Sequence, residues 1–203
     1  MLGVMFSKSL LLVMGLALAA PAAWANPSFV SPPVLLTPPP AAPSLCQSQN
    51  QAFAQDAEAL IAERINGERA KFAPGAPPLM PDIDLTRIAQ RRSCDMARGM
   101  SDFSHTNAQG NFIAGDMARA RFGPYGAVGE NIMEMSGTVQ LGRLPFGPEQ
   151  FAGEAVEGWM ESPGHRKNIL NPRYDTSGIG VAMVGGQAFA TQVFRGPPRV
   201  LDK

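Results

Sequence analysis

The stretch GIGVAMVGGQAFATQVF, residues 178–194, consists of two apolar arms separated by a Gly-Gly pair. In each arm large residues alternate with smaller or polar ones, which is the two-residue period of a β-strand. A Gly-Gly link between two such arms is a strong hairpin signal, because glycine tolerates the positive φ angles of a tight turn. The C-terminal part of the chain is therefore predicted to form an antiparallel hairpin.

Upstream of the hairpin, apolar residues recur with the period of a helix. A first amphipathic helix is predicted to end before residue 73, with an apolar face of Ala54, Ala57, Leu60, Ile61 and Ile65. A second is predicted to begin at an N-cap, Asp82 or Asp84, and to stop near Gly99. Its apolar face contains Leu85, Ile88, Ala89, Ser93 and Met96, with Arg91 and Arg92 on the opposite face.

Three further segments complete the expected elements. Residues 112–123 have the pattern of a short helix, and residues 148–162 have an apolar arc that includes Phe151 and Trp159. Residues 123–135 form a glycine-punctuated loop that leads into a strand-like piece. Because helices come first and the hairpin last, we expect an α+β fold with helices packed on a sheet.

The first 25 residues have the organisation of an export signal. Lys8 supplies the positive charge, residues 10–20 form an apolar run too short to span a bilayer, and Ala23-Trp24-Ala25 is a small-x-small cleavage triplet. We therefore expect residues 1–25 to be a cleaved signal peptide, with an uncleaved N-terminal anchor as the alternative. The protein is expected in the periplasm or outside the cell, with no transmembrane segment after signal removal.

Residues 26–45 are rich in proline, which fixes φ and removes backbone donors, so neither a helix nor a sheet can propagate through them. They are predicted to be an extended tether, which leaves one domain over residues 46–203. The 17 basic and 17 acidic residues of the chain cancel, so its overall charge gives no reason to expect nucleic acid as a partner.

Cys46 and Cys94 are the two cysteines of the chain. An exported protein folds in an oxidising compartment, so we expect a disulfide between them. Two buried free thiols remain the alternative, because sequence spacing does not show that the residues meet. Neither cysteine lies in a Cys-His motif, so no catalytic role is assigned to them.

The candidate residues for chemistry are His105, Glu130 and His165, each in a turn-rich context. Loops held by a rigid scaffold often have functional roles. Two imidazoles and a carboxylate form a suitable ligand set for a divalent ion such as zinc. Histidines this far apart in a sequence are more often ordinary surface or hydrogen-bonded loop residues, and the residue pattern alone leaves both interpretations open.

Six segments together resemble the bacterial branch of the CAP superfamily (cysteine-rich secretory, antigen-five and pathogenesis-related proteins), whose domain is also called the SCP domain. They occur in the family's order and approximate spacing between Cys46 and Phe194: INGERAKFAPGAPPL (65–79), LTRIAQRRSCDMA (85–97), FSHTNAQG (103–110), GENI (129–132), WMESPGHRKNIL (159–170) and YDTSGIGVA (174–182). The resemblance implies an α-β-α sandwich with a small, mainly antiparallel sheet between helical layers.

The resemblance also implies a central cavity built around two histidines and two acids, which holds a divalent metal in some members. His105 and His165 match the histidines, and Glu130 matches the first acid. The position of the second acid is occupied here by Ser162. Glu161 could replace the missing acid only if the helix unwinds before Ser162-Pro163, because Glu161 otherwise lies opposite the apolar arc.

Two functions follow from these observations. The first is a secreted, monomeric binding module, in which the cavity of His105, Glu130 and His165, with or without zinc held by the two histidines, binds a small apolar ligand or a cell-envelope component. The second is a zinc-assisted hydrolase, resembling a peptidase, in which Glu130 activates the water. The missing acid favours binding, because loss of one general base typically lowers a rate by about 10²–10⁴-fold. No catalytic residue is assigned under the first function.

Overall fold

The computed structural model describes residues 50–123, 126–137 and 146–197. The predicted signal peptide, the tether, Cys46 and most of the segment between residues 135 and 147 lie outside these residues. Five helices occur within them: α2 (Gln51–Phe72), α3 (Ile83–Ala97), α4 (Ile113–Phe122), α5 (Pro148–Glu161) and α6 (Pro163–Ile169). Four strands accompany these helices: β1 (Met80–Pro81), β2 (Val128–Ser136), β3 (Thr176–Val184) and β4 (Gln187–Arg195).

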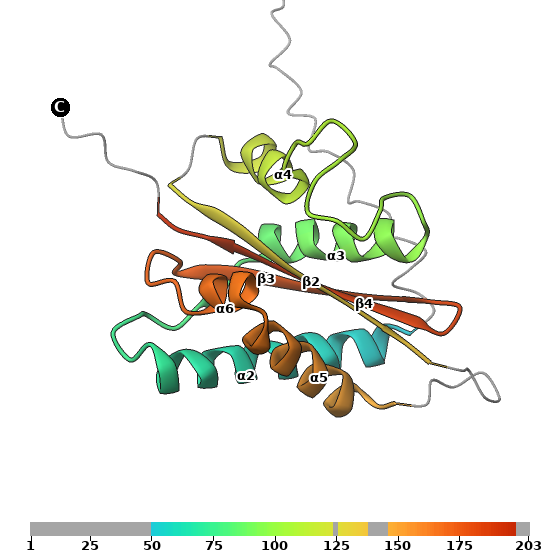
Figure 1. The fold of residues 1–203 in the computed structure, drawn as a ribbon, viewed down its shortest axis with the longest axis horizontal. Helices are drawn as coiled ribbons and strands as arrows, with labels where there is room; N and C mark the ends of the chain where they lie inside the picture. The colour runs from blue at the N-terminus through green and yellow to red at the C-terminus, as the bar shows by residue number, and fades with distance from the viewer. Residues whose placement is uncertain (1–49, 124–125, 138–145, 198–203) are drawn as a thin grey trace, which may run out of the picture. The chain divides into compact units, whose positions relative to one another are not determined.

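The strands form one sheet in the order β1-β3-β4-β2, in which β1 is parallel to β3 and the other pairs are antiparallel. Figure 1 shows α3 and α4 on one face of this sheet and α2, α5 and α6 on the other. The predicted α-β-α sandwich with a mainly antiparallel sheet is thereby confirmed. None of the helices in the described residues is long and apolar enough to cross a membrane.

The hairpin of β3 and β4 follows the sequence prediction closely. Gly185 and Gly186 adopt φ angles of 60° and 91°, as a tight primed turn requires, and Val184 pairs directly with Gln187. Both strands are buried on both faces, because helices cover each side of the sheet. The smaller residues of each arm therefore face a helix and not water.

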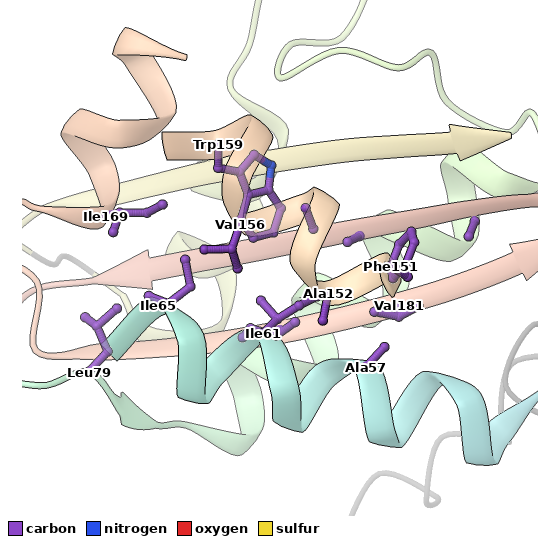
Figure 2. Packing of buried hydrophobic residues seen from close by; sticks show 14 of the residues in the cluster. Ala57, Ile61, Ile65, Leu79, Phe151, Ala152, Val156, Trp159, Ile169 and Val181 are labelled. Atoms are coloured by element: carbon purple, nitrogen blue, oxygen red, sulfur yellow. The ribbon is translucent and has the colours of Figure 1, made fainter. Parts of the chain in front are cut away.

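The core below the sheet lies between α2, α5 and the strands. Figure 2 shows Ile61 and Ile65 of α2 directed toward the residues of α5, with Val156 and Trp159 in the same cluster. The Trp159 indole N–H donates to the Ile132 carbonyl oxygen at 2.9 Å, so this buried ring keeps its hydrogen bond. The predicted apolar faces of these two helices thus form the main core.

The second helix begins at Asp82, whose carboxylate accepts from the backbone N–H groups of Asp84 and Leu85. The prediction that Arg92 lies on the face opposite the core is wrong. Arg91 is exposed, but Arg92 is only 1% exposed. The guanidinium of Arg92 lies between α3 and the sheet, where it pairs with the carboxylate of Glu130 on β2. Arg92 follows Leu85 by seven residues, about two helical turns, so it lies on the same face as Leu85, which the sheet and α4 cover.

Candidate functional site

The three candidate side chains come together beside β2, which is an edge strand of the sheet. Successive residues of a strand point to opposite faces. Glu130 accordingly bonds with α3 on one side of the sheet, and Asn131 bonds with α6 on the other. The sequence-based placement of Glu130 in a loop is therefore wrong, because GEN lies within β2.

Glu130 is held by two partners, and its side chain is fully buried. Its Oε1 accepts from Arg92 Nε at 2.9 Å, and its Oε2 lies 2.9 Å from His105 Nδ1. Arg92 also donates to the Ser104 carbonyl oxygen, which fixes the loop that bears His105. Both carboxylate oxygens are therefore engaged by groups from the α3 side of the sheet.

This arrangement fixes the tautomer of His105. An ionised carboxylate only accepts hydrogen bonds, so the Nδ1 of His105 carries the proton and its Nε2 has a lone pair when the ring is neutral. The side chain of His105 is 42% exposed, so solvent reaches the site from this side. Glu130 thus acts as a support that orients the ring, in the manner of the carboxylates behind metal-bound histidines.

His165 faces His105 across a short gap. The two Nε2 atoms are 3.4 Å apart, and the rings meet edge to face at a centroid distance of 5.5 Å. Burial and the neighbouring charge of His105 lower the pKa of His165, and the charge of Glu130 partly opposes them. A neutral His165 is therefore favoured, and a neutral imidazole is the form that binds metals.

Helix α6 positions His165, which corrects the sequence-based placement of this residue in a turn-rich loop. Asn168 of the same helix donates to the Glu130 carbonyl oxygen at 3.1 Å and to Asn131 Oδ1 at 2.9 Å. Asn131 in turn donates to the His165 carbonyl oxygen at 3.2 Å. At the other end of α6, buried Arg69 donates to the carbonyl oxygen of Ile169. The helix is therefore bonded to both β2 and α2.

The distance between the Nε2 atoms of His105 and His165 is suitable for two ligands of one metal ion. Any further ligands would have to come from outside the group of His105, Glu130 and His165. Two atoms bound to a tetrahedral zinc ion at about 2.0–2.1 Å are about 3.3–3.4 Å apart, which matches the gap between the Nε2 atoms. Among the residues that the structure describes, no group of three or more His, Cys, Asp or Glu side chains is placed to hold an ion. Glu130 supports His105 and adds no third ligand.

The structure places Glu161 apart from this cluster and makes Ser162 the N-cap of α6. The backbone carbonyl oxygen of Ser162 accepts from the Arg166 backbone N–H at 2.8 Å, and the Ser162 side chain makes no cap bond. Glu161 is exposed at the end of α5, where it lines a separate hollow of about 450 Å³ between α2, α5 and α6. The missing second acid is therefore not supplied by Glu161.

The structure describes one of the two cysteines, Cys94. Cys94 is buried on α3 in an apolar cluster that includes Ala182 and Phe189. Its expected partner, Cys46, lies outside the described residues, so the disulfide stays a prediction.

Comparison with known proteins identifies the family of the chain. The model of the cysteine-rich secretory protein family, CAP, matches residues 62–194. The chain belongs to the CAP family. The curated protein YkwD of Bacillus subtilis (strain 168) is 36% identical over 140 residues, which cover 68% of this chain and 47% of YkwD. This CAP domain thus corresponds to about half the length of that relative.

The solved structures that are similar to this CAP domain include the following two. One is an extracellular protein containing an SCP domain from Bacillus anthracis, with 26% identity, a TM-score of 0.53, and coverage of 72% of this chain and 42% of that one. The other is NaASP2 with Zn²⁺, with 13% identity, a TM-score of 0.50, and coverage of 73% and 87%. Because the identity to NaASP2 is only 13%, this similarity concerns the fold alone.

Two residues of this CAP domain that support the site were not singled out as site residues from the sequence. The sequence predicts Arg92 on the face of α3 away from the core, and Asn168 belongs to the segment after His165 without a predicted role. A signal for Asn168 was present, since it follows His165 by three residues and so lies on the same face of a helix. A signal for Arg92 was present as well, since it follows Leu85 by seven residues and Ile88 by four and so lies on the apolar face of α3, whereas Arg91 does not.

Proposed function

We propose that this CAP domain is the binding module of an exported protein and that it takes up a small amphipathic molecule with an alkyl chain. The observation that supports this proposal is the hollow between α2, α5 and α6, whose volume of about 450 Å³ is within the usual range for a small-molecule site. The extracellular Bacillus anthracis relative and the expected signal peptide support export.

The lining of this hollow suits such a ligand. Its apolar part is formed by Phe72, Val156 and Met160. Its charged rim is formed by Arg64, Glu68, Lys71, Glu157, Glu161 and Arg166. Phe72 is 45% exposed, and the Lys71 ammonium and the Arg166 guanidinium each lie 4.6 Å from its ring centre. An alkyl chain against the apolar part would leave a polar headgroup among charges of both signs.

The histidine pair is proposed to hold a divalent cation beside this module. His105 and His165 would provide two ligands through Nε2, oriented by Glu130 and by Asn131 respectively. A bound ion of this kind supplies a Lewis acid that attracts an anionic or carbonyl oxygen of a ligand. His165 and Arg166 are adjacent on α6, so the same short helix contributes to the cation pair and to the amphipathic hollow.

Binding is favoured over the alternative of zinc-assisted hydrolysis by the engagement of Glu130. A general base must accept a proton from water with an oxygen that can reach it. Both oxygens of Glu130 already face donors, one on Arg92 and one on His105. The geometry therefore supports an orienting role for this carboxylate.

Filling the hollow is expected to abolish ligand uptake while leaving the fold intact. In the variant Gly153→Leu, the new side chain projects into the hollow, where an added Cβ meets only the end of the flexible Arg64 side chain, at 3.4 Å. We expect the affinity for a fluorescent fatty acid, dansyl-undecanoic acid, to fall by at least about tenfold, because steric filling removes the chain's binding volume. Fluorescence titration measures this change.

Gly158→Leu is the matched control, because Gly158 lies on the same helix, is exposed and has open space around it. Its affinity for the fatty acid should equal that of the wild type. An equal loss in both variants, or saturable uptake unaffected by Gly153→Leu, would contradict the proposal.

Loss of either histidine is expected to remove zinc binding. His105→Gln and His165→Gln each delete one of the two facing Nε2 atoms, so the zinc affinity measured by calorimetry should fall by more than about tenfold. Glu161→Gln should leave it within about twofold, because the Glu161 side chain lines the separate hollow. Equal zinc affinity in all three variants would show that zinc binds elsewhere.

A further inference from the structure

A second hollow lies at the opposite edge of the sheet, where β1 stops pairing with β3. β1 covers only two residues of β3, through the pairs Met80–Thr176 and Pro81–Ser177. Pro81 has no N–H, and the chain turns at once into α3 with Asp82 as its cap, so the ladder ends there. Within the described residues, no strand continues along the outer edge of β3 beyond this point.

The hollow has a volume of about 310 Å³ and shares no residue with the histidine cluster or the hollow between α2, α5 and α6. Apolar walls come from Ala59, Ala62, Ile65, Leu79, Pro81 and Ile179. Polar groups come from Glu58, Glu63, Asn66, Thr86 and Ser177. No basic residue lines it, so its charge is negative.

Backbone groups of β3 face this hollow as well. The Ser177 carbonyl oxygen accepts from the Asp82 N–H, and the Val181 N–H donates to Glu58, so both residues direct their backbone groups to the outer edge. In an antiparallel pair, every second residue directs its backbone groups to the same side. Ile179 lies between them and therefore directs its own carbonyl oxygen to this edge.

The structural contacts of Glu58 do not require a charged carboxylate. Its Oε1 accepts from the Val181 N–H at 2.9 Å and from the Gln90 amide at 3.3 Å. A neutral glutamine would accept the same bonds without the cost of burying a charge. Burial raises the pKa of Glu58, and no basic side chain among the described residues pairs with it. The carboxylate is thus suited to a cation from outside the chain.

We propose that this hollow binds a primary alkylammonium group, either of a free amine or of a lysine side chain. The ammonium has three donors and would meet the Glu58 carboxylate and the Ile179 carbonyl oxygen at the strand edge. The alkyl stem would lie against the apolar walls, and Glu63 would add negative charge at the exposed side.

The test is a calorimetric titration of the full chain with three probes: cadaverine, Nα-acetyl-lysine amide and neutral n-pentanol. We expect saturable binding of at least one amine and none of pentanol. Glu58→Gln keeps an acceptor for Val181 but removes the charge, and should weaken amine binding by at least about tenfold. Ala62→Phe fills the hollow from an exposed position and should weaken it equally.

Ala70→Phe is the matched control on the same helix, at an exposed position away from the hollow, and should bind the amines like the wild type. Binding of cadaverine alone would identify free amines as the guest, and binding of the lysine derivative alone would identify a peptide side chain. The proposal is overturned if neither amine binds saturably, or if both Glu58→Gln and Ala62→Phe leave binding unchanged. The Gly153→Leu variant tests the other hollow, so the two proposals fail separately.

Discussion

Replacing Gly178 with alanine is expected to lower the free energy of unfolding by about 3 kcal/mol or more, the upper part of the range for overpacked cores. A Cβ at this position would overlap the backbone nitrogen of Thr86 and the carbonyl carbon of Leu85 at the start of α3. These are backbone atoms of a packed helix, so no side chain can rotate away to relieve the overlap. Helix α3 would have to move off β3, the element with which it makes its most extensive contact.

Urea denaturation of the wild type and the variant measures this loss. Gly180→Ala should behave alike, because a Cβ there would overlap the backbone nitrogen of Gln90 one turn further along α3. Gly67→Ala is the control: Gly67 is exposed inside α2 with nothing within 4 Å of an added Cβ, so the change should stabilise by about 0.5–1 kcal/mol. Unchanged stability of Gly178→Ala would mean that α3 does not lie directly on the glycines of β3.

The same contact shows how much of the fold the sequence could predict. The hairpin and the helices were predictable because their periods are local, and Asp82 was one of two foreseen caps. Gly178 and Gly180 were visible only as small residues in a strand. Glycine is needed at both positions because the backbone of α3 lies directly against the sheet there, and the residues of α3 that make this contact are about ninety positions away in the sequence. The two-residue strand β1 has no periodic signal, so its parallel pairing could not be foreseen.

The candidate site was predictable only through the family resemblance. His105 and His165 are 60 positions apart, and no local pattern shows that their rings meet. The sequence placed Glu130 in a loop, because the glycines around it resemble a turn, whereas burial on an edge strand gives it its fixed orientation. Arg92 follows Ile88 by four residues and so shares the apolar face of α3, but its partner Glu130 is 38 positions away, and no local pattern shows that the two charges meet.

Replacing Arg92 with methionine is accordingly expected to lower the free energy of unfolding by about 3–5 kcal/mol, the usual cost of removing one member of a buried ion pair. Methionine fills much of the volume, but the fully buried Glu130 carboxylate loses its counter-charge. The Ser104 carbonyl oxygen also loses its donor, so the loop bearing His105 is released. Zinc affinity should therefore fall together with stability in this variant, although Arg92 touches neither Nε2 atom.

Arg91→Met provides the control, because Arg91 pairs with Asp95 at the surface, and an exposed pair contributes less than about 1 kcal/mol. The double variant Arg92→Met with Glu130→Gln should regain more than half of the lost stability, since the uncompensated charge is gone and the amide can still accept from His105. Its zinc affinity should stay low, because an amide orients the imidazole less firmly than a carboxylate does. If Arg92→Met cost no more than Arg91→Met, the charge of Glu130 would not depend on Arg92, and the orienting role of this ion pair would have to be abandoned.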